Sequence, residues 1–130
     1  MNVRQYRALS LRETDVDGTM RRLRGDEALY TMCLDAFLTD PTIEQLNISV
    51  ENDSWDEAFT AAHALKGVAG NMGFVPLMHN TGQLIVLLRG GRIKELSQSL
   101  AQVNSAYRDI VDGIRQYFAF AGENRKEDAI

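Results

Sequence analysis

The sequence predicts an all-α fold, an antiparallel four-helix bundle with a short N-terminal helix. The first observation is that only two prolines interrupt the 130 residues. The second is that apolar residues recur three and four positions apart along most of the chain, whereas the alternation typical of strands is rare. The third is an apolar content of 45%, which is sufficient for one hydrophobic core in a single domain.

The N-terminal part of the chain predicts a lead-in followed by two helices. Residues 1–13 are expected to be a loose lead-in. A first short helix should start at Thr14 or Asp15 and stop at Gly25, because glycine readily adopts the left-handed conformation that ends a helix. Asp26 is suited to cap the next helix through its carboxylate. One face of this next helix carries the expected core residues Leu29, Cys33 and Phe37.

Pro41 interrupts this second helix, because proline removes a backbone donor and clashes with the preceding turn. The chain beyond it is expected to continue as a kinked extension of the same rod. Thr42 is the predicted cap of the extension, and Ile43, Leu46 and Val50 are its predicted core side chains.

A central helix is predicted to follow Ser54 and to reach Met72. Residues 54–57 have the form of a capping box, with two acidic residues in the first turn that suit the helix dipole. Gly73 is the expected end of this helix. One side of it gathers the residues Trp55, Ala58, Ala62, Leu65, Ala69 and Met72. Its apolar character predicts that it lies in the middle of the bundle.

Two further helices complete the predicted bundle. Pro76 fits the first turn of a helix that runs to Arg89, and Gly90 and Gly91 predict a tight reversal after it. The buried residues expected in that helix are Leu77, Leu84, Ile85 and Leu88. The last helix carries a heptad seam of Ile93, Leu96, Leu100, Val103, Tyr107, Ile110, Ile114 and Tyr117. The bundle is expected to span residues 14–120, and residues 121–130 are expected to form a charged tail.

Composition argues against several classes of function. The formal net charge is −4 and the basic residues are scattered, so the chain lacks the basic patch of a nucleic-acid-binding protein. It has no apolar run of 18 residues and no signal-peptide pattern, which predicts a cytoplasmic protein without a membrane partner. The single cysteine, Cys33, permits no disulfide within the chain. His63 and His79 are the two histidines, and no spacing typical of a metal site is present.

One strip of the central helix carries the residues most suited to chemistry. Residues three, four and seven apart share a helix face, so His63, Lys66, Gly67 and Gly70 are expected to lie together. A glycine within a helix costs about 1 kcal/mol relative to alanine. Two glycines beside an imidazole and a cation therefore indicate a histidine that is presented to another protein at close range.

The segment from His63 to Gly67 reads His-Ala-Leu-Lys-Gly and is followed by Asn71 and Gly73. It resembles the His-x-Leu-Lys-Gly…Asn-x-Gly signature of histidine-containing phosphotransfer (HPt) domains. Three upstream segments are also similar to that family, namely residues 22–30, 37–40 and 53–55. The resemblance covers roughly residues 14–118 and implies a four-helix bundle with a short N-terminal helix. It also implies a phosphocarrier of two-component phosphorelays, without kinase activity of its own.

The resemblance implies a role for each residue of the strip. His63 is the implied phosphoacceptor, reacting through Nε2, because a neutral imidazole is a competent nucleophile near neutral pH. Lys66 would offset the charge of the phosphoryl group. Gly67 and Gly70 would let the loops of a partner approach the backbone. Phe59, one turn before the histidine, would add an apolar docking contact.

The implied partners are the receiver domains of response regulators and a sensor histidine kinase, including the hybrid kind that carries its own receiver. The phosphoryl group would move between His63 and the aspartates of receivers. The chain is expected to hold no cofactor or metal of its own, because the sequence places no carboxylate cluster around His63. Mg²⁺ is expected to be supplied by the receiver. The protein is expected to be a monomer.

Two positions depart from the family pattern, and two other functions remain open. Val68 stands where a serine or another small residue is usual, and Ile85 where many members carry a glutamine or glutamate that hydrogen-bonds the histidine. The main alternative is an HPt-like binding module that docks and inhibits a response regulator without being phosphorylated. The second is a helical dimerisation scaffold that uses a spare face of the last helix.

Overall fold

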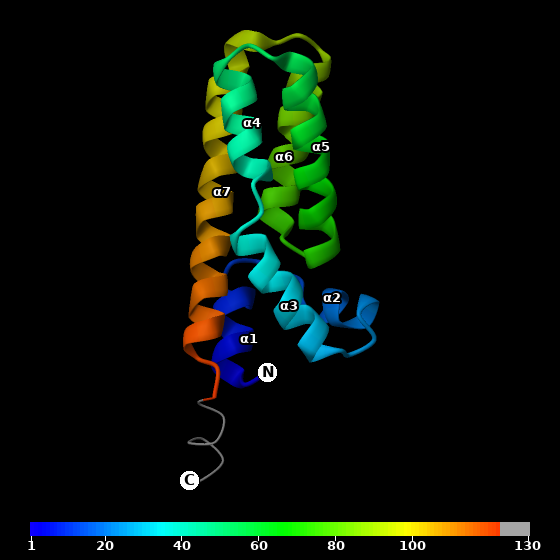
Figure 1. Ribbon diagram of the computed structural model, residues 1–130, viewed down its shortest axis with the longest axis vertical. Helices are drawn as coiled ribbons and strands as arrows, with labels where there is room; N and C mark the ends of the chain where they lie inside the picture. The colour runs from blue at the N-terminus through cyan, green and yellow to red at the C-terminus, as the bar shows by residue number, and fades with distance from the viewer. Residues whose placement is uncertain (123–130) are drawn as a thin grey trace.

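The computed structural model describes residues 1–122, and these form seven helices. In chain order the helices are α1 (Val3–Ser10), α2 (Val16–Arg22), α3 (Glu27–Leu38), α4 (Thr42–Glu51), α5 (Trp55–Met72), α6 (Val75–Arg89) and α7 (Ile93–Ala119). Figure 1 shows α7 running the length of the molecule, with α4, α5 and α6 in the upper half and α1 and α3 beside its lower half. Residues 1–122 contain no β-strand, so the predicted all-α class is confirmed.

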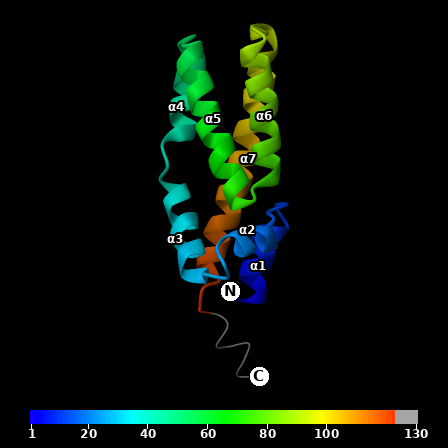
Figure 2. The same cartoon turned by 90° about the vertical axis from the view of Figure 1, so that its right-hand side faces the viewer.

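Helices α4 to α7 form the predicted antiparallel four-helix bundle. Helix α5 packs between α4 and α6, and α6 packs in turn on α7, as Figure 2 shows for the upper half of the molecule. The turn between α6 and α7 contains Gly91 at a φ of +68°, which matches the predicted reversal. The inner face of α5 consists mainly of small side chains, and its buried residues are Ala58, Ala61, Ala62, Leu65, Ala69 and Met72.

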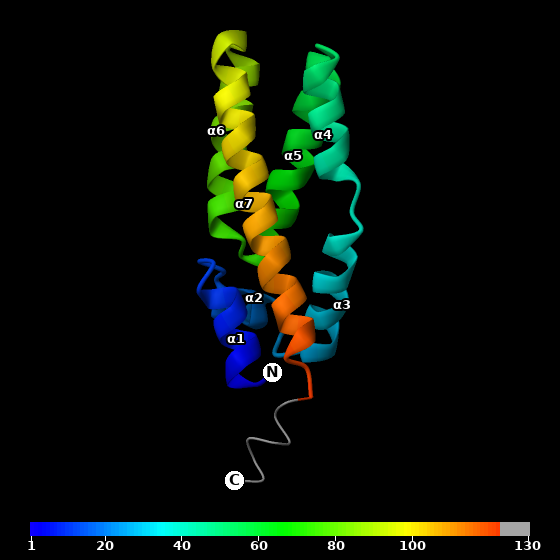
Figure 3. The ribbon, with the colours of Figure 1, turned by 90° about the vertical axis from the view of Figure 1, so that its left-hand side faces the viewer.

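A break at Pro41 divides the second predicted helix into α3 and α4, which follow one another along one side of the molecule (Figure 3). The prediction that Thr42 caps the extension is wrong. Thr42 is the first helical residue of α4, and its backbone N–H donates to Oδ1 of Asp40 at 2.8 Å. The carboxylate that precedes the proline therefore satisfies a backbone donor at the start of α4.

The prediction of a loose lead-in is wrong, because residues 3–10 form α1. Asn2 and Gln5 make a capping box that starts this helix. The same two side chains dock α1 onto α7. Nδ2 of Asn2 donates to the backbone oxygen of Phe120 at 2.8 Å, and Nε2 of Gln5 donates to that of Tyr117 at 3.2 Å. The helix is only eight residues long and polar overall, so its sequence resembles an irregular N-terminal segment.

The predicted aspartate caps of the next two helices are confirmed, whereas α2 ends at Arg22, three residues before the predicted stop at Gly25. Oδ1 of Asp15 accepts a hydrogen bond from the backbone N–H of Gly18 at 3.0 Å and so caps α2. Gly25 follows α2 with a φ of +74°. Oδ1 of Asp26 accepts from the backbone N–H of Leu29 at 3.0 Å and caps α3. The two aspartate caps are therefore read correctly from local residue types.

The predicted inner face of α3 is turned by about one residue from the observed face. The buried residues of α3 are Tyr30, Leu34 and Phe37, whereas Leu29 is 40% exposed and Cys33 is half-buried. Two long-range contacts set this rotation. The ring of Phe37 meets that of Phe74 edge-on at a centroid distance of 4.9 Å, and Thr31 Oγ1 lies 2.8 Å from the hydroxyl of Tyr117.

Smaller differences occur at the ends of the bundle helices. Ser54 precedes α5, but its side chain makes no capping hydrogen bond within residues 1–122, so the predicted capping box is not formed. Leu96, Val103, Ile110, Ile114 and Tyr117 of the α7 seam are buried, whereas Ile93 is exposed as the first residue of the helix.

Of the predicted charged tail, residues 123–130 lie outside the described residues. The division of the chain after residues 13 and 120 stays a prediction. Within residues 1–122, no helix combines the length and the apolar character that crossing a membrane requires.

Candidate functional site

The strip predicted on the central helix lies along α5, on a side that is turned away from the core. His63, Lys66 and Gly67 are exposed, whereas Gly70 is half-buried. Their position follows from the packing of the opposite side of α5, where Leu65 and a series of alanines are buried. Because a helix places residues three and four apart on one face, burying that side turns the imidazole outward.

An aromatic ring and a cation lie beside the histidine. The ring of Phe59, one turn earlier on α5, meets the ring of His63 at a centroid distance of 4.6 Å and an interplanar angle of 67°. The guanidinium carbon of Arg89, in the last turn of α6, lies 5.5 Å from the centroid of Phe59. The sequence does not single out Arg89, because only the antiparallel pairing of α5 and α6 brings it to this face.

The side chain of Lys66 lies against α6. A Cβ atom added to Gly82 would stand 3.7 Å from Cε and 3.8 Å from Nζ of Lys66, so the end of the lysine side chain lies at contact distance from the α6 backbone. Lys66 also lines a groove of about 480 Å³ between α5 and α6, whose other walls include Met78 and His79. The cation of Lys66 therefore lies along the helix pair, one turn from His63.

The two glycines of the strip differ in their surroundings. A Cβ atom added to Gly67 would have no atom of the described residues within 4 Å, apart from its chain neighbours and its own helix backbone. At Gly70 the added Cβ would lie 3.3 Å from Sδ of Met78. Gly67 therefore offers open surface, whereas Gly70 makes room for the packing of Met78 of α6. Val68, between them, is half-buried against the core.

The middle of α6 presents no polar side chain opposite the histidine. The contacts of α6 with Phe59 and Lys66 bracket His63, so the middle of α6 lies level with it. There Ile85 is 4% exposed and Val86 is 64% exposed. Gln83 lies nearby, but its Nε2 is 3.2 Å from Nε2 of His79. The departure from the family pattern at Ile85 is therefore a buried apolar contact, and Val86 adds an apolar surface.

Residues of α2 and the residue before it form hydrogen bonds with the C-terminal end of α5, just beyond His63, Lys66 and Gly67. The guanidinium group of Arg22 donates to the backbone oxygens of Gly70 at 3.3 Å and of Asn71 at 3.0 Å. The backbone N–H of Asp15 donates to the oxygen of Gly73 at 2.8 Å. Carbonyls in the last turn of a helix lack partners within it, so these bonds fix the end of α5.

The arrangement is suited to receive an anionic group at the surface. The imidazole of His63 carries nitrogen atoms that can act as nucleophiles. Lys66 supplies positive charge one turn away on α5, and Arg89 supplies it from α6 beside Phe59. Within residues 1–122, no group of three or more His, Cys, Asp or Glu side chains is placed to hold a metal ion.

Comparison with known proteins places the chain in a family. The family model of the Hpt domain, the histidine phosphotransfer module of two-component systems, matches residues 29–117. The match covers more than half of the chain and contains His63 and the rest of the strip. No curated protein and no solved structure matches the chain significantly. The chain belongs to the Hpt domain family.

Proposed function

We propose that the protein carries a phosphoryl group on His63 between the aspartates of receiver domains in a two-component phosphorelay. The observation that supports this most is the exposed imidazole on α5, within the matched segment and on one strip with Lys66 and Gly67. A nucleophile that reacts with a residue of another protein has to be exposed, and its surroundings have to admit the backbone of that protein. Gly67 supplies that open surface.

In the proposed transfer, the lone pair of Nε2 of neutral His63 attacks the phosphorus of an aspartyl phosphate on a receiver. An N–P bond forms while the acyl O–P bond breaks, and the electrons of the broken bond return to the receiver carboxylate. The reverse step passes the phosphoryl group to the aspartate of a second receiver. Catalysis of such a transfer comes mainly from positioning and from stabilisation of charge.

Positively charged groups from both proteins offset the charge of the phosphoryl group. Lys66 and Arg89 each contribute on the order of 1 kcal/mol or less, because both are exposed to solvent. Mg²⁺ is proposed to come with the receiver, beside its aspartate, and a sensor histidine kinase is proposed to supply the phosphate. The protein acts as a monomer and as one half of the reacting site.

Transfer of phosphate from isolated phosphorylated receivers to the purified protein tests whether His63 is the phosphoacceptor. The purified protein is mixed with Mg²⁺ and receiver domains that have been phosphorylated with acetyl phosphate, and the phosphate bound to it is measured. We expect acid-labile, alkali-stable label on the wild type and none on folded His63→Gln. His79→Gln is the matched control and should keep the label. Receivers that bind the wild type without labelling it would contradict the proposal and support an inhibitory docking module.

A further inference from the structure

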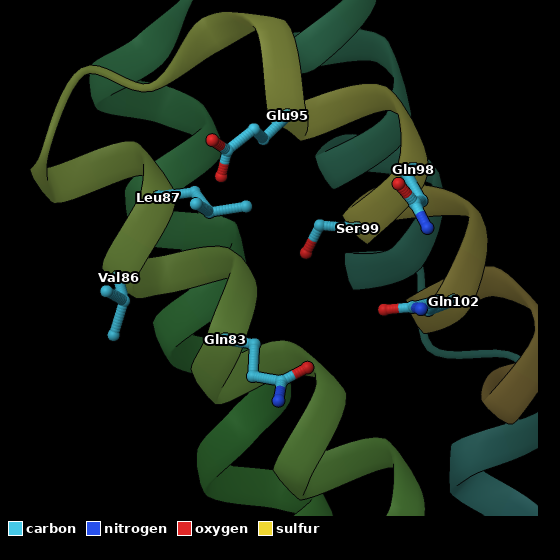
Figure 4. A pocket seen from close by; sticks show the side chains of 7 residues that line it. All are labelled: Gln83, Val86, Leu87, Glu95, Gln98, Ser99 and Gln102. Carbon is cyan, nitrogen blue, oxygen red and sulfur yellow. The ribbon is translucent and has the colours of Figure 1, made fainter.

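A second groove, of about 440 Å³, lies between α6 and α7. Figure 4 shows the side chains that line it from the two helices. Most of its polar lining consists of carboxamides, and the residues are Gln83, Val86 and Leu87 from α6 with Glu95, Gln98, Ser99 and Gln102 from α7. This groove contains none of the residues assigned above to phosphotransfer.

The hydroxyl group of Ser99 indicates that the groove takes a hydrogen-bonding ligand. Ser99 is only 7% exposed, and its Oγ points into the groove in Figure 4. A serine within a helix commonly donates to the backbone oxygen four residues earlier. Oγ of Ser99 instead has no hydrogen-bond partner within residues 1–122. This oxygen is covered by neighbouring atoms in the free protein. Because burying an unpaired hydroxyl is unfavourable, a ligand group that displaces this cover and pairs with Oγ would gain affinity.

The charge of the groove disfavours an ionic ligand. Among the described residues that line it there is no lysine or arginine, and the one carboxylate, Glu95, already pairs with Arg92. Each of the three carboxamides offers N–H donors and an oxygen acceptor, as a peptide group does. Val86 and Leu87 add an aliphatic surface for a side chain. The lining therefore matches an extended, uncharged stretch of polypeptide.

The groove is continuous with the surface around the phosphotransfer site. Gln83 and Val86 line it and also line the groove beside Lys66, so the exposed ridge of α6 separates the two. A protein seated over His63 would have to cross only this ridge to reach Ser99.

We propose that the α6–α7 groove binds an extended, uncharged segment of the receiver-bearing partner that docks on His63. The inference rests on the proposed function, because it takes the phosphorelay partner as the occupant. The segment would pair its main chain with the carboxamides and with Ser99. Since the groove holds none of the reacting atoms, it would add affinity and partner selection without changing the chemical step.

The first test compares Gln98→Ala/Gln102→Ala with Gln116→Ala. Gln116 is an exposed glutamine of the same helix that does not line the groove. The rate of transfer from a phosphorylated receiver is measured against receiver concentration. We expect the double variant to raise the half-saturating concentration about tenfold and to keep the maximal rate within about twofold, because His63 is unchanged. Gln116→Ala should match the wild type, and a double variant that also matches it would overturn the inference.

A second test detects binding in the groove independently of phosphate transfer. The ¹⁵N-labelled protein is titrated with the same receivers, unphosphorylated, and the side-chain amide signals are followed by NMR. We expect the signals of Gln83, Gln98 and Gln102 to shift while that of Gln116 stays. Shifts confined to α5 would overturn the groove proposal alone. Groove shifts in a protein that takes no label would overturn phosphotransfer alone, and a protein that binds no receiver would overturn both.

Discussion

In the proposed transfer, Lys66 is the residue of the strip that would stabilise the phosphoryl group on His63 through its charge. Lys66→Gln removes this charge and keeps much of the side chain that lies along Gly82. An exposed cation contributes up to ~1 kcal/mol, so we expect transfer to slow about fivefold, with a smaller effect at high salt. Rapid-quench measurement of the transfer rate tests this. Lys94→Gln, at an exposed lysine of α7, is the control, and equal slowing in both variants would contradict the role of Lys66.

The residues around His63 divide into those that the sequence could place and those that it could not. His63, Lys66 and Gly67 lie three or four residues apart, so helical periodicity alone puts them on one face, and the structure has them exposed. Arg89 and Val86 belong to the next helix, and only the pairing of α5 with α6 brings them to the site. Their relation to His63 is a tertiary property that no local pattern contains.

Gly67 makes α5 less stable than an alanine at the same position would. No described atom outside its own helix backbone and chain neighbours lies within 4 Å of an added Cβ there, so Gly67→Ala should raise the free energy of unfolding by up to ~1 kcal/mol. The same methyl group should weaken the docking of a receiver. Urea unfolding measures the first effect and receiver titration the second. A more stable variant that binds receivers as tightly as the wild type would contradict the function assigned to this glycine.

Gly73, in the turn after α5, is packed more tightly than Gly25, in the turn after α2. Gly73 and Gly25 both have a φ of +74°, which costs other residues roughly 1–2 kcal/mol. A Cβ atom on Gly73 would also lie 2.6 Å from the backbone oxygen of Asp15, whereas one on Gly25 would have no described atom within 4 Å. Gly73→Ala should therefore lower the urea midpoint more than Gly25→Ala does. Equal losses would contradict the close contact between α2 and the end of α5.

Element ends were predictable where a single residue type decides them. Asp15, Asp26 and Gly73 act as their residue types predict, because capping depends on a few neighbouring atoms. Helix α1 is not predicted from the sequence because it is short and polar overall, and it is fixed in place by contacts of Asn2 and Gln5 with the distant end of α7. The rotation of α3 was misjudged because Leu29 and Tyr30 are both apolar enough to be buried, and packing against other helices decides between them.

The whole molecule includes α1, although the matched family segment begins at residue 29. Leu9 of α1 is fully buried in the common core, whereas Leu11 just after the helix is 73% exposed. Leu9→Ala should therefore lower the free energy of unfolding by about 2–5 kcal/mol, and Leu11→Ala by less than about 0.5 kcal/mol. Chemical denaturation of the two variants measures this. A small loss in Leu9→Ala would contradict the inclusion of α1 in the folded unit.

The architecture as a whole was predictable to the extent that it depends on periodicity. Repeated three- and four-residue spacing and two glycine turns specify four consecutive antiparallel helices, which the structure contains as α4 to α7 with α3 continuing the rod. The arrangement of the lower half depends on polar contacts between distant segments, such as Arg22 with the end of α5. Such contacts leave no periodic trace in the sequence.

Locating the phosphate on the protein is the decisive test of phosphotransfer through His63. After transfer from a phosphorylated receiver, the protein is digested at alkaline pH and the modified residue is located by tandem mass spectrometry. The proposed function predicts phosphate on His63 and none on His79, although both histidines are exposed. Phosphate on His79 or on another residue would contradict it, and so would an unmodified protein recovered from a stable complex with the receiver.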